Sequence, residues 1–250
     1  MLLKLLCCNV FMREACLAIA ESPHIIDVEY TELGEHIHSQ TLRELLQAKI
    51  DDTARSAKKY DAILLLFGIC GNATIGLRAP ATIPLVIPRG HDCCTILLGS
   101  RARFTEHFKD NPSMPFSSCG YMERGEYYLR TGDGETPTLQ YGDGFAALVE
   151  QYGEENARYV WDEMHPPSLD ASHKEAVFIT HPETAHLGHA DRFKAKAEAE
   201  GKTFVELQGS LQLIRGLIRG DWNEADFLTV SPGKTIAGVY DWDKVIQEGA

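Results

Sequence analysis

Two short apolar segments near the middle of the chain constrain its fold most. Residues 62–67 (AILLLF) and residues 83–87 (IPLVI) are almost wholly apolar, and each is followed by a turn that contains glycine and cysteine. Strands of this composition are typical of the interior of a parallel sheet, where helices cover both faces. Ligands of open α/β sheets bind just beyond the carboxyl ends of such strands. We therefore expect a functional site at these two turns.

Strands and helices alternate around these two segments. Further apolar segments predict strands at residues 2–6, 25–30, 176–180, 203–207 and 227–230. Helix-forming segments predict helices at residues 11–21, 41–59, 95–108, 144–164, 190–200 and 210–219. This alternation predicts the α/β class, with mostly parallel sheets and right-handed crossovers.

The order of these elements predicts two Rossmann-like lobes, with the ligand site between them at the strand carboxyl ends. Residues 1–111 are expected to form the N-terminal lobe, which carries the cysteine site. Residues 112–143 are rich in Gly, Pro, Ser and Tyr and are predicted to form a linker or lid. Residues 144–250 are expected to form the C-terminal lobe.

Charge and cysteine content exclude several classes of protein. The net charge is −12 over 250 residues, which argues against a nucleic-acid partner. No apolar run reaches the roughly 18 residues of a membrane span. Seven cysteines, an odd number, occur without a secretion signal, so we expect a cytoplasmic protein without a disulfide framework. The sequence is compatible with an oligomer. No GxGxxG, GxxxxGK[ST] or GxSxG motif occurs.

Three cysteines follow three strands that are expected to be neighbours. Cys8, Cys70 and Cys93 come directly or shortly after the first, third and fourth predicted strands. Neighbouring strands lie about 4.8 Å apart, so the three thiols could meet at one metal ion. Three thiolates suit zinc or cobalt, or alternatively an iron–sulfur cluster, and leave one coordination position open. The alternative is that these cysteines only pack in the core, as we expect for Cys7, Cys16, Cys94 and Cys119.

Polar residues beside these cysteines are candidates for proton transfer. His91 could be a fourth ligand, a general acid or a turn residue, and Asp92 could activate water or cap the following helix. Glu14 could act as a base, or be a solvated helix carboxylate. The histidines at positions 181, 186 and 189 match no common metal-binding spacing and are expected in a solvated loop.

Five further residues are candidates for substrate binding. Arg89 could bind a carboxylate in bidentate fashion or form an internal salt bridge. Asn72 and Thr74 could hydrogen-bond a ligand or only shape their turn. Ser210 and Lys234 lie in turns after predicted strands, and a helix that begins near Ser210 would attract an anion. Ordinary connecting loops are the alternative for both.

Three segments resemble the DUF1638 family, an uncharacterised prokaryotic family: CNVFMRE, FGICGNATIGLRA and VIPRGHDCCTILLGS. In the second half the resemblance covers only the Gly-Ser and Ser-Pro-Gly-Lys turns. It implies that Cys8, Cys70 and Cys93 recur in the family, with His91 and Asp92 beside the last. Some members occur beside corrinoid-dependent methyltransferase systems. The chain is also similar to the thiohydantoin desulfhydrase of ergothioneine degradation, a metal-dependent enzyme that replaces a thioxo sulfur by oxygen.

These observations lead to three hypotheses about function. The first is a metal-dependent hydrolase, a desulfhydrase that releases sulfide from a small anionic thiohydantoin-like substrate. The second is a metal- or corrinoid-handling binding protein that serves methyltransferases. The third is a small-molecule binder whose cysteines lie only in the core, and metal analysis separates it from the other two.

Overall fold

The computed structural model describes residues 1–32, 39–110, 114, 116–124, 154, 174–239, 241 and 244–250. These residues form a mixed α/β protein with mostly parallel sheets, which confirms the predicted class. The predicted helix at 144–164, apart from residue 154, and most of the linker at 112–143 lie outside the described residues. Within the described part of the chain, no helix is long and apolar enough to cross a membrane.

The larger sheet has five strands in the order β2-β1-β3-β4-β8. Its first four strands are parallel: β1 (Leu2–Cys8), β2 (Ile25–Thr31), β3 (Ala62–Leu66) and β4 (Leu85–Pro88). Every side chain of β3 and β4 is buried, as their continuous apolar sequences predict. The fifth strand, β8 (Phe227–Val230), pairs with β4 in the antiparallel direction.

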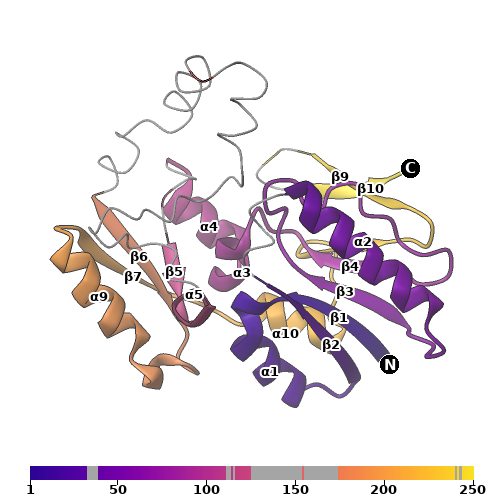
Figure 1. Cartoon of the computed structure of the whole chain (residues 1–250), viewed down its shortest axis with the longest axis horizontal. Coiled ribbons are helices and arrows are strands. Elements are labelled where there is room, and N and C mark those ends of the chain that lie inside the picture. Colours follow the sequence, from indigo (N-terminus) through magenta and orange to yellow (C-terminus); the bar gives the residue numbers. More distant parts are fainter. Residues whose placement is uncertain are drawn as a thin grey trace.

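Helices cover both faces of this sheet (Figure 1). The helices α1 (Met12–Ala20) and α10 (Gln212–Arg219) pack together on one face, and α2 (Ser39–Arg55) lies on the other. Helix α2 buries Leu42, Leu46 and Ile50, which recur every four residues and therefore share one side of the helix. The chain passes from β1 outward to β2 and then back to β3, so successive crossover helices lie on opposite faces.

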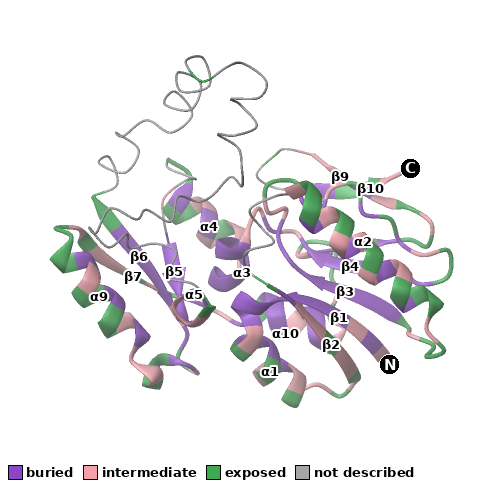
Figure 2. Cartoon of the chain, in the orientation of Figure 1, coloured by how far each residue is buried: buried purple, intermediate pink, exposed green. Residues whose placement is uncertain are grey.

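The smaller sheet is parallel throughout, with the order β5-β6-β7. Its strands are β5 (Phe116–Ser118), β6 (Glu175–Thr180) and β7 (Thr203–Gln208). Helix α9 (His189–Ala199) packs on one face against Phe178. Val177 and Ile179, on the opposite face, belong to the main hydrophobic core, so both faces of β6 are buried (Figure 2). The short helix α5 (Cys119–Arg124) follows β5 directly and contacts the 3-10 turn η1 (Asn9–Phe11).

The structure differs from the sequence prediction at four places. The predicted helix at 95–108 is two helices, α3 (Cys93–Leu98) and α4 (Arg101–Phe108), separated by Gly99 in a left-handed conformation (φ 76°). Strand β5 and helix α5 lie inside the segment that was predicted as a linker. Strand β8 joins the larger sheet instead of continuing the second alternation. A hairpin of β9 (Thr235–Gly238) and β10 (Ile246–Gly249) was not predicted. The domain boundaries stay a prediction.

Candidate functional site

The three predicted cysteine ligands follow three adjacent strands at the carboxyl edge of the larger sheet. Cys8 ends β1, Cys70 lies in the turn after β3, and Cys93 begins α3 just after β4. The connections after β1 and β3 lead in opposite directions along the sheet. This is a topological switch point, the position where open α/β sheets bind their ligands.

Backbone contacts join the two turns that carry Cys70 and Cys93. The amide of Ile69 donates to the carbonyl of Gly90 (3.0 Å), and the amide of Cys70 donates to the carbonyl of His91 (3.3 Å). A Cβ atom at Gly68 would lie 2.6 Å from Cα of Asp92, so only glycine allows this approach. The two turns therefore continue the β3–β4 pairing and hold the two cysteines in one arrangement.

The turn around Cys70 has an unusual backbone. Cys70, Gly71 and Asn72 all have positive φ values, of 47°, 63° and 69°. For residues with a side chain this conformation costs about 1–2 kcal/mol each. Thr74 stabilises the turn, because its hydroxyl donates to the carbonyl of Gly68 (3.2 Å). Strained backbone of this kind concentrates at functional sites.

The sulfur atoms of Cys70 and Cys93 lie 4.0 Å apart. Two thiolates on one zinc ion, each about 2.3 Å from the metal in tetrahedral geometry, are separated by about 3.8 Å. The neighbouring thiol of Cys93 and burial raise the pKa of Cys70 well above its usual range, and Cys8 raises it further. The sulfur of Cys8 is nevertheless more than 4.8 Å from at least one of the other two, since these three do not form a compact ligand group among the described residues.

The neighbours of Cys93 have defined structural contacts. The Asp92 carboxylate caps α3 by accepting from the amide of Thr95 (3.0 Å) and from its hydroxyl (3.3 Å). Burial raises the pKa of Asp92 to about 6, although these hydrogen bonds favour its ionised form. The ring of His91 stacks on Phe104, with 5.6 Å between ring centroids. The capping role expected as an alternative for Asp92 is therefore present.

Glu14 is fully buried in the first turn of α1, so it is not a solvated helix carboxylate. Burial raises its pKa to about 7. Its Oε1 atom lies 3.7 Å from Nδ1 of His181, which follows β6 and is 1% exposed. The prediction of a solvated histidine loop was therefore wrong for His181, and also for His189, which is buried, whereas His186 is exposed.

The predicted substrate-binding residues do not gather at one place. The Arg89 guanidinium donates to the carbonyls of Glu224 (2.9 Å), Phe227 (3.2 Å), Lys244 (3.0 Å) and Ile246. These contacts tie the end of the chain to β4.

Ser210 packs beside α3, where its amide donates to the carbonyl of Leu97 (3.0 Å). Lys234 follows β8, and the antiparallel direction of β8 puts this turn at the edge where β4 begins, opposite the cysteines. Roles in substrate binding stay predictions for Arg89, Asn72, Thr74, Ser210 and Lys234.

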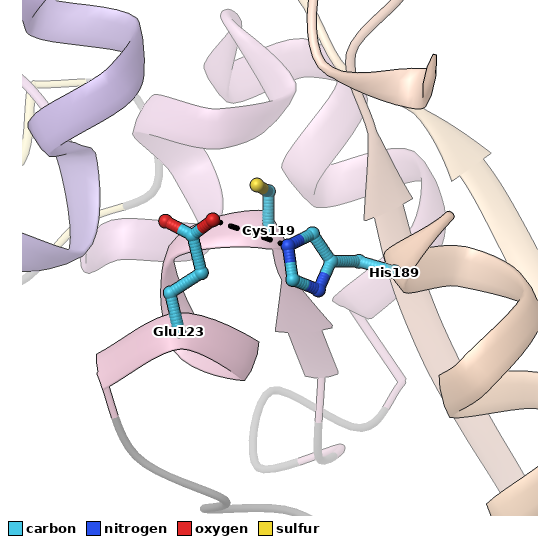
Figure 3. Close-up of side chains that lie close together, drawn as sticks. All are labelled: Cys119, Glu123 and His189. Atoms are coloured by element: carbon cyan, nitrogen blue, oxygen red, sulfur yellow. Dashed lines mark hydrogen bonds and ion pairs between the residues drawn. The ribbon is translucent and has the colours of Figure 1, made fainter. Parts of the chain in front are cut away.

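A second group of ligand-type side chains was missed by the sequence analysis (Figure 3). Cys119 and Glu123 lie one turn apart on α5, and His189 begins α9; one ligand atom from each lies within 4.8 Å of the others, so the group could hold a metal ion. The spacing of four residues between Cys119 and Glu123 on one helix was the available signal.

The hydrogen bonds of this second group oppose metal binding as it stands. Arg13 donates from Nε to both carboxylate oxygens of Glu123 (2.8 and 2.9 Å). Arg192 donates to Nδ1 of His189 (2.9 Å), so Nε2 carries the ring proton and donates to Glu123 (3.2 Å). Burial raises the pKa of Cys119 to about 11. A cation would have to displace Arg13 from the carboxylate and change the tautomer of His189.

The described fold and the Cys70–Cys93 pair define an α/β protein with candidate metal-binding thiols at the carboxyl edge of its larger sheet. The chain belongs to the DUF1638 family, described as a protein of unknown function, whose pattern matches residues 30–218. This segment includes Cys70, Cys93 and the Cys119 group, whereas Cys8 and Glu14 precede it. Comparison with curated proteins and with solved structures found no match.

Proposed function

We propose that this protein is a metal-dependent hydrolytic desulfurase, which replaces the thioxo sulfur of a small anionic thiohydantoin-like compound by oxygen and releases sulfide. The observation that supports this proposal is the Cys70–Cys93 pair, whose sulfurs lie 4.0 Å apart on two turns joined by backbone hydrogen bonds. In this proposal the two sheets belong to two Rossmann-like lobes, and the substrate binds between them at their carboxyl edges.

Cys70 and Cys93 suit a soft divalent ion, whereas the sulfur of Cys8 would have to move closer to complete the site. Cys70 and Cys93 would hold zinc or cobalt, with Cys8 as the third ligand; an iron–sulfur cluster is the alternative. Removing the Cys70 proton is opposed by its hydrogen bond with Cys93 and by burial, which raise its pKa, and a bound cation would reverse that effect. When bound, the metal supplies a Lewis acid for the C=S group and lowers the pKa of water.

The reaction needs a group that accepts a proton from the attacking water and donates a proton to the leaving sulfide. Water forms a C–O bond with the thioxo carbon, the C–S bond breaks, and both protons of the water leave with the sulfide. A carboxyl with a pKa near the working pH suits both tasks, and Glu14 has a pKa of about 7. Asp92 contributes by capping α3, because this cap orients the first turn that contains Cys93.

The test is an anaerobic purification followed by elemental analysis and a sulfide assay with a thiohydantoin carboxylate. We expect about one metal ion or cluster per chain, and its loss in Cys70→Ser and Cys93→Ser together with a fall in activity of at least about 100-fold. Cys16→Ser is the control, because Cys16 is exposed and lies outside the pair. A fully metal-loaded wild type that releases no sulfide would overturn the proposal; a change in the visible spectrum of an added corrinoid would then favour the binding-protein hypothesis.

A further inference from the structure

Glu14 and His181 form a buried polar pair where the two sheets meet. Glu14 belongs to α1, which follows β1, and His181 follows β6 of the smaller sheet. Their side chains are 0% and 1% exposed, and Oε1 lies 3.7 Å from Nδ1. Neither carboxylate oxygen nor Nδ1 has a hydrogen-bond partner among the described residues. Buried polar atoms without partners are rare and need an explanation.

The ring of His181 has a defined tautomer. Its Nε2 atom lies 2.9 Å from the carbonyl oxygen of Leu97 in α3. A carbonyl only accepts, so Nε2 carries the proton and Nδ1 of the neutral ring is an acceptor. Gly209 makes room for this contact, since a Cβ atom there would lie 2.4 Å from Nε2 and 2.8 Å from the Leu97 oxygen. The surrounding backbone therefore directs the Nδ1 lone pair towards Glu14.

An ionised Glu14 and a neutral His181 would place two acceptors face to face in a buried site, which is unfavourable. A single proton on Glu14 resolves this, because the carboxyl can then donate to Nδ1 after a small side-chain movement. Burial raises the pKa of Glu14 to about 7 and lowers the pKa of His181, and both shifts favour this neutral pair.

Charged and titratable groups on several elements face the pair. Those that act on Glu14 are Arg13, Glu123 and Glu183, and Glu14 in turn raises the pKa values of Cys7 and Cys119. Those that act on His181 are Arg103, Glu183 and Arg215. Helix α3 links the pair to the cysteine site, because it contains both Leu97, which accepts from His181, and Cys93.

We propose that His181 is the positioning residue of Glu14: its Nδ1 accepts a hydrogen bond from the neutral Glu14 carboxyl, so that this carboxyl proton is held between the two side chains. The delivery of this proton to the leaving sulfide rests on the proposed function, and Glu14 regains a proton from the attacking water. The existence of the proton-sharing pair does not rest on that function.

The first experiment does not need activity. Infrared spectra at pH 6 should show the C=O stretch of a buried protonated carboxyl. Asp92 is also partly protonated at pH 6, so the Glu14 band is the C=O stretch that remains in the difference spectrum of wild type minus Glu14→Gln. His181→Gln should shift this band, because the Gln amide can still donate to Leu97 but replaces the Nδ1 acceptor by an amide oxygen. His186→Gln, at an exposed histidine, should leave it unchanged. Nitrogen NMR should show the His181 proton on Nε2. If Glu14→Gln removed no intensity beyond the Asp92 band, or if His181→Gln left the Glu14 band unshifted, the pair would be overturned.

The second experiment tests delivery in the metal-loaded protein. His181→Gln should lower kcat about 10- to 100-fold and move the pH profile of kcat, with metal content and KM little changed. His186→Gln should change none of these quantities. An unchanged pH profile in His181→Gln would overturn the delivery step. A wild type that releases no sulfide removes the proposed function and the delivery step together, and the infrared band then decides alone whether the pair exists.

Discussion

Two buried carboxyl groups, Glu14 and Asp92, stand out at the scale of single residues. Burial is the largest cause of the raised pKa in each, so their ionised forms are less favourable in the folded protein than in the unfolded chain. Ionisation of each group at neutral pH therefore lowers the stability of the protein. Buried acids with such shifts are typical of functional sites, and Asp92 directly precedes Cys93 of the thiol pair.

Glu14→Gln should stabilise the protein, and more so at high pH. The pKa of Glu14 rises from about 4.5 in the unfolded chain to about 7 in the folded protein. Its contribution to stability is therefore fully present below pH 4.5 and is lost as the pH rises through about 7. Gln does not ionise, so the gain in the free energy of unfolding should be about 2–3 kcal/mol larger at pH 8 than at pH 5.

Urea unfolding of wild type and Glu14→Gln at both pH values measures this difference. Glu198→Gln is the control, because the Glu198 side chain is 59% exposed. A gain for Glu14→Gln that is equal at pH 5 and pH 8 would show that Glu14 is not buried as the structure has it.

At the scale of elements, the strands that carry the cysteines were the most predictable part. Continuous apolar segments identified β3 and β4, and alternation with helices identified their parallel direction. The direction of β8 was not predictable, because its four-residue sequence FLTV suits either orientation. Strand β5 has only three residues inside a Gly- and Ser-rich segment, which is too short for a period to appear.

The candidate site was predictable only in part for a similar reason. The positions of Cys70 and Cys93 after neighbouring strands follow from strand order, and they do meet. The burial of Glu14 and His181 depends on contacts between α1 and the end of β6, which are 167 positions apart (181 minus 14). No local pattern in the sequence carries that information.

Gly68→Ala should disrupt the junction of the two cysteine-bearing turns. The new Cβ atom would meet the backbone of Asp92 at 2.6–2.8 Å, and backbone cannot move aside without breaking the hydrogen bonds between the turns. We expect a loss of stability of about 2 kcal/mol or more, as for other overpacked sites, together with weaker metal binding.

Gly90→Ala is the matched control for Gly68→Ala. Its Cβ atom would have ordinary contacts, at 3.5 Å from its nearest neighbours, although it lies in the facing turn. Thermal unfolding and metal titration of both variants compare them directly. Equal effects of the two substitutions would contradict the close packing of Gly68 on Asp92.

At the scale of the whole molecule, the last segment of the chain returns to the larger sheet after the smaller sheet is complete. Helix α10 packs on α1, β8 pairs with β4, and the guanidinium of Arg89 holds four backbone carbonyls of residues 224–246. The carboxyl edges of the two sheets meet around α3, where Leu97 accepts from both His181 and Ser210. The C-terminal segment therefore packs against the larger sheet near the candidate site.

Arg89→Met should weaken the attachment of the C-terminal segment to the larger sheet. The variant keeps most of the apolar stem but removes every donor, so the four carbonyls lose these hydrogen bonds, of which those to Phe227 and Ile246 are part-buried. We expect a loss of about 2–3 kcal/mol in the free energy of unfolding and faster proteolysis within residues 224–250. Arg89→Lys should retain only part of the wild-type stability, because one ammonium group cannot reach all four acceptors. Arg55→Met, at a side chain that is 70% exposed, should change neither quantity. The opposite result would be unchanged stability and proteolysis in Arg89→Met together with a raised KM for an anionic substrate. Arg89 would then be a carboxylate-binding residue, as the sequence first suggested, and its proposed role in holding the C-terminal segment would be wrong.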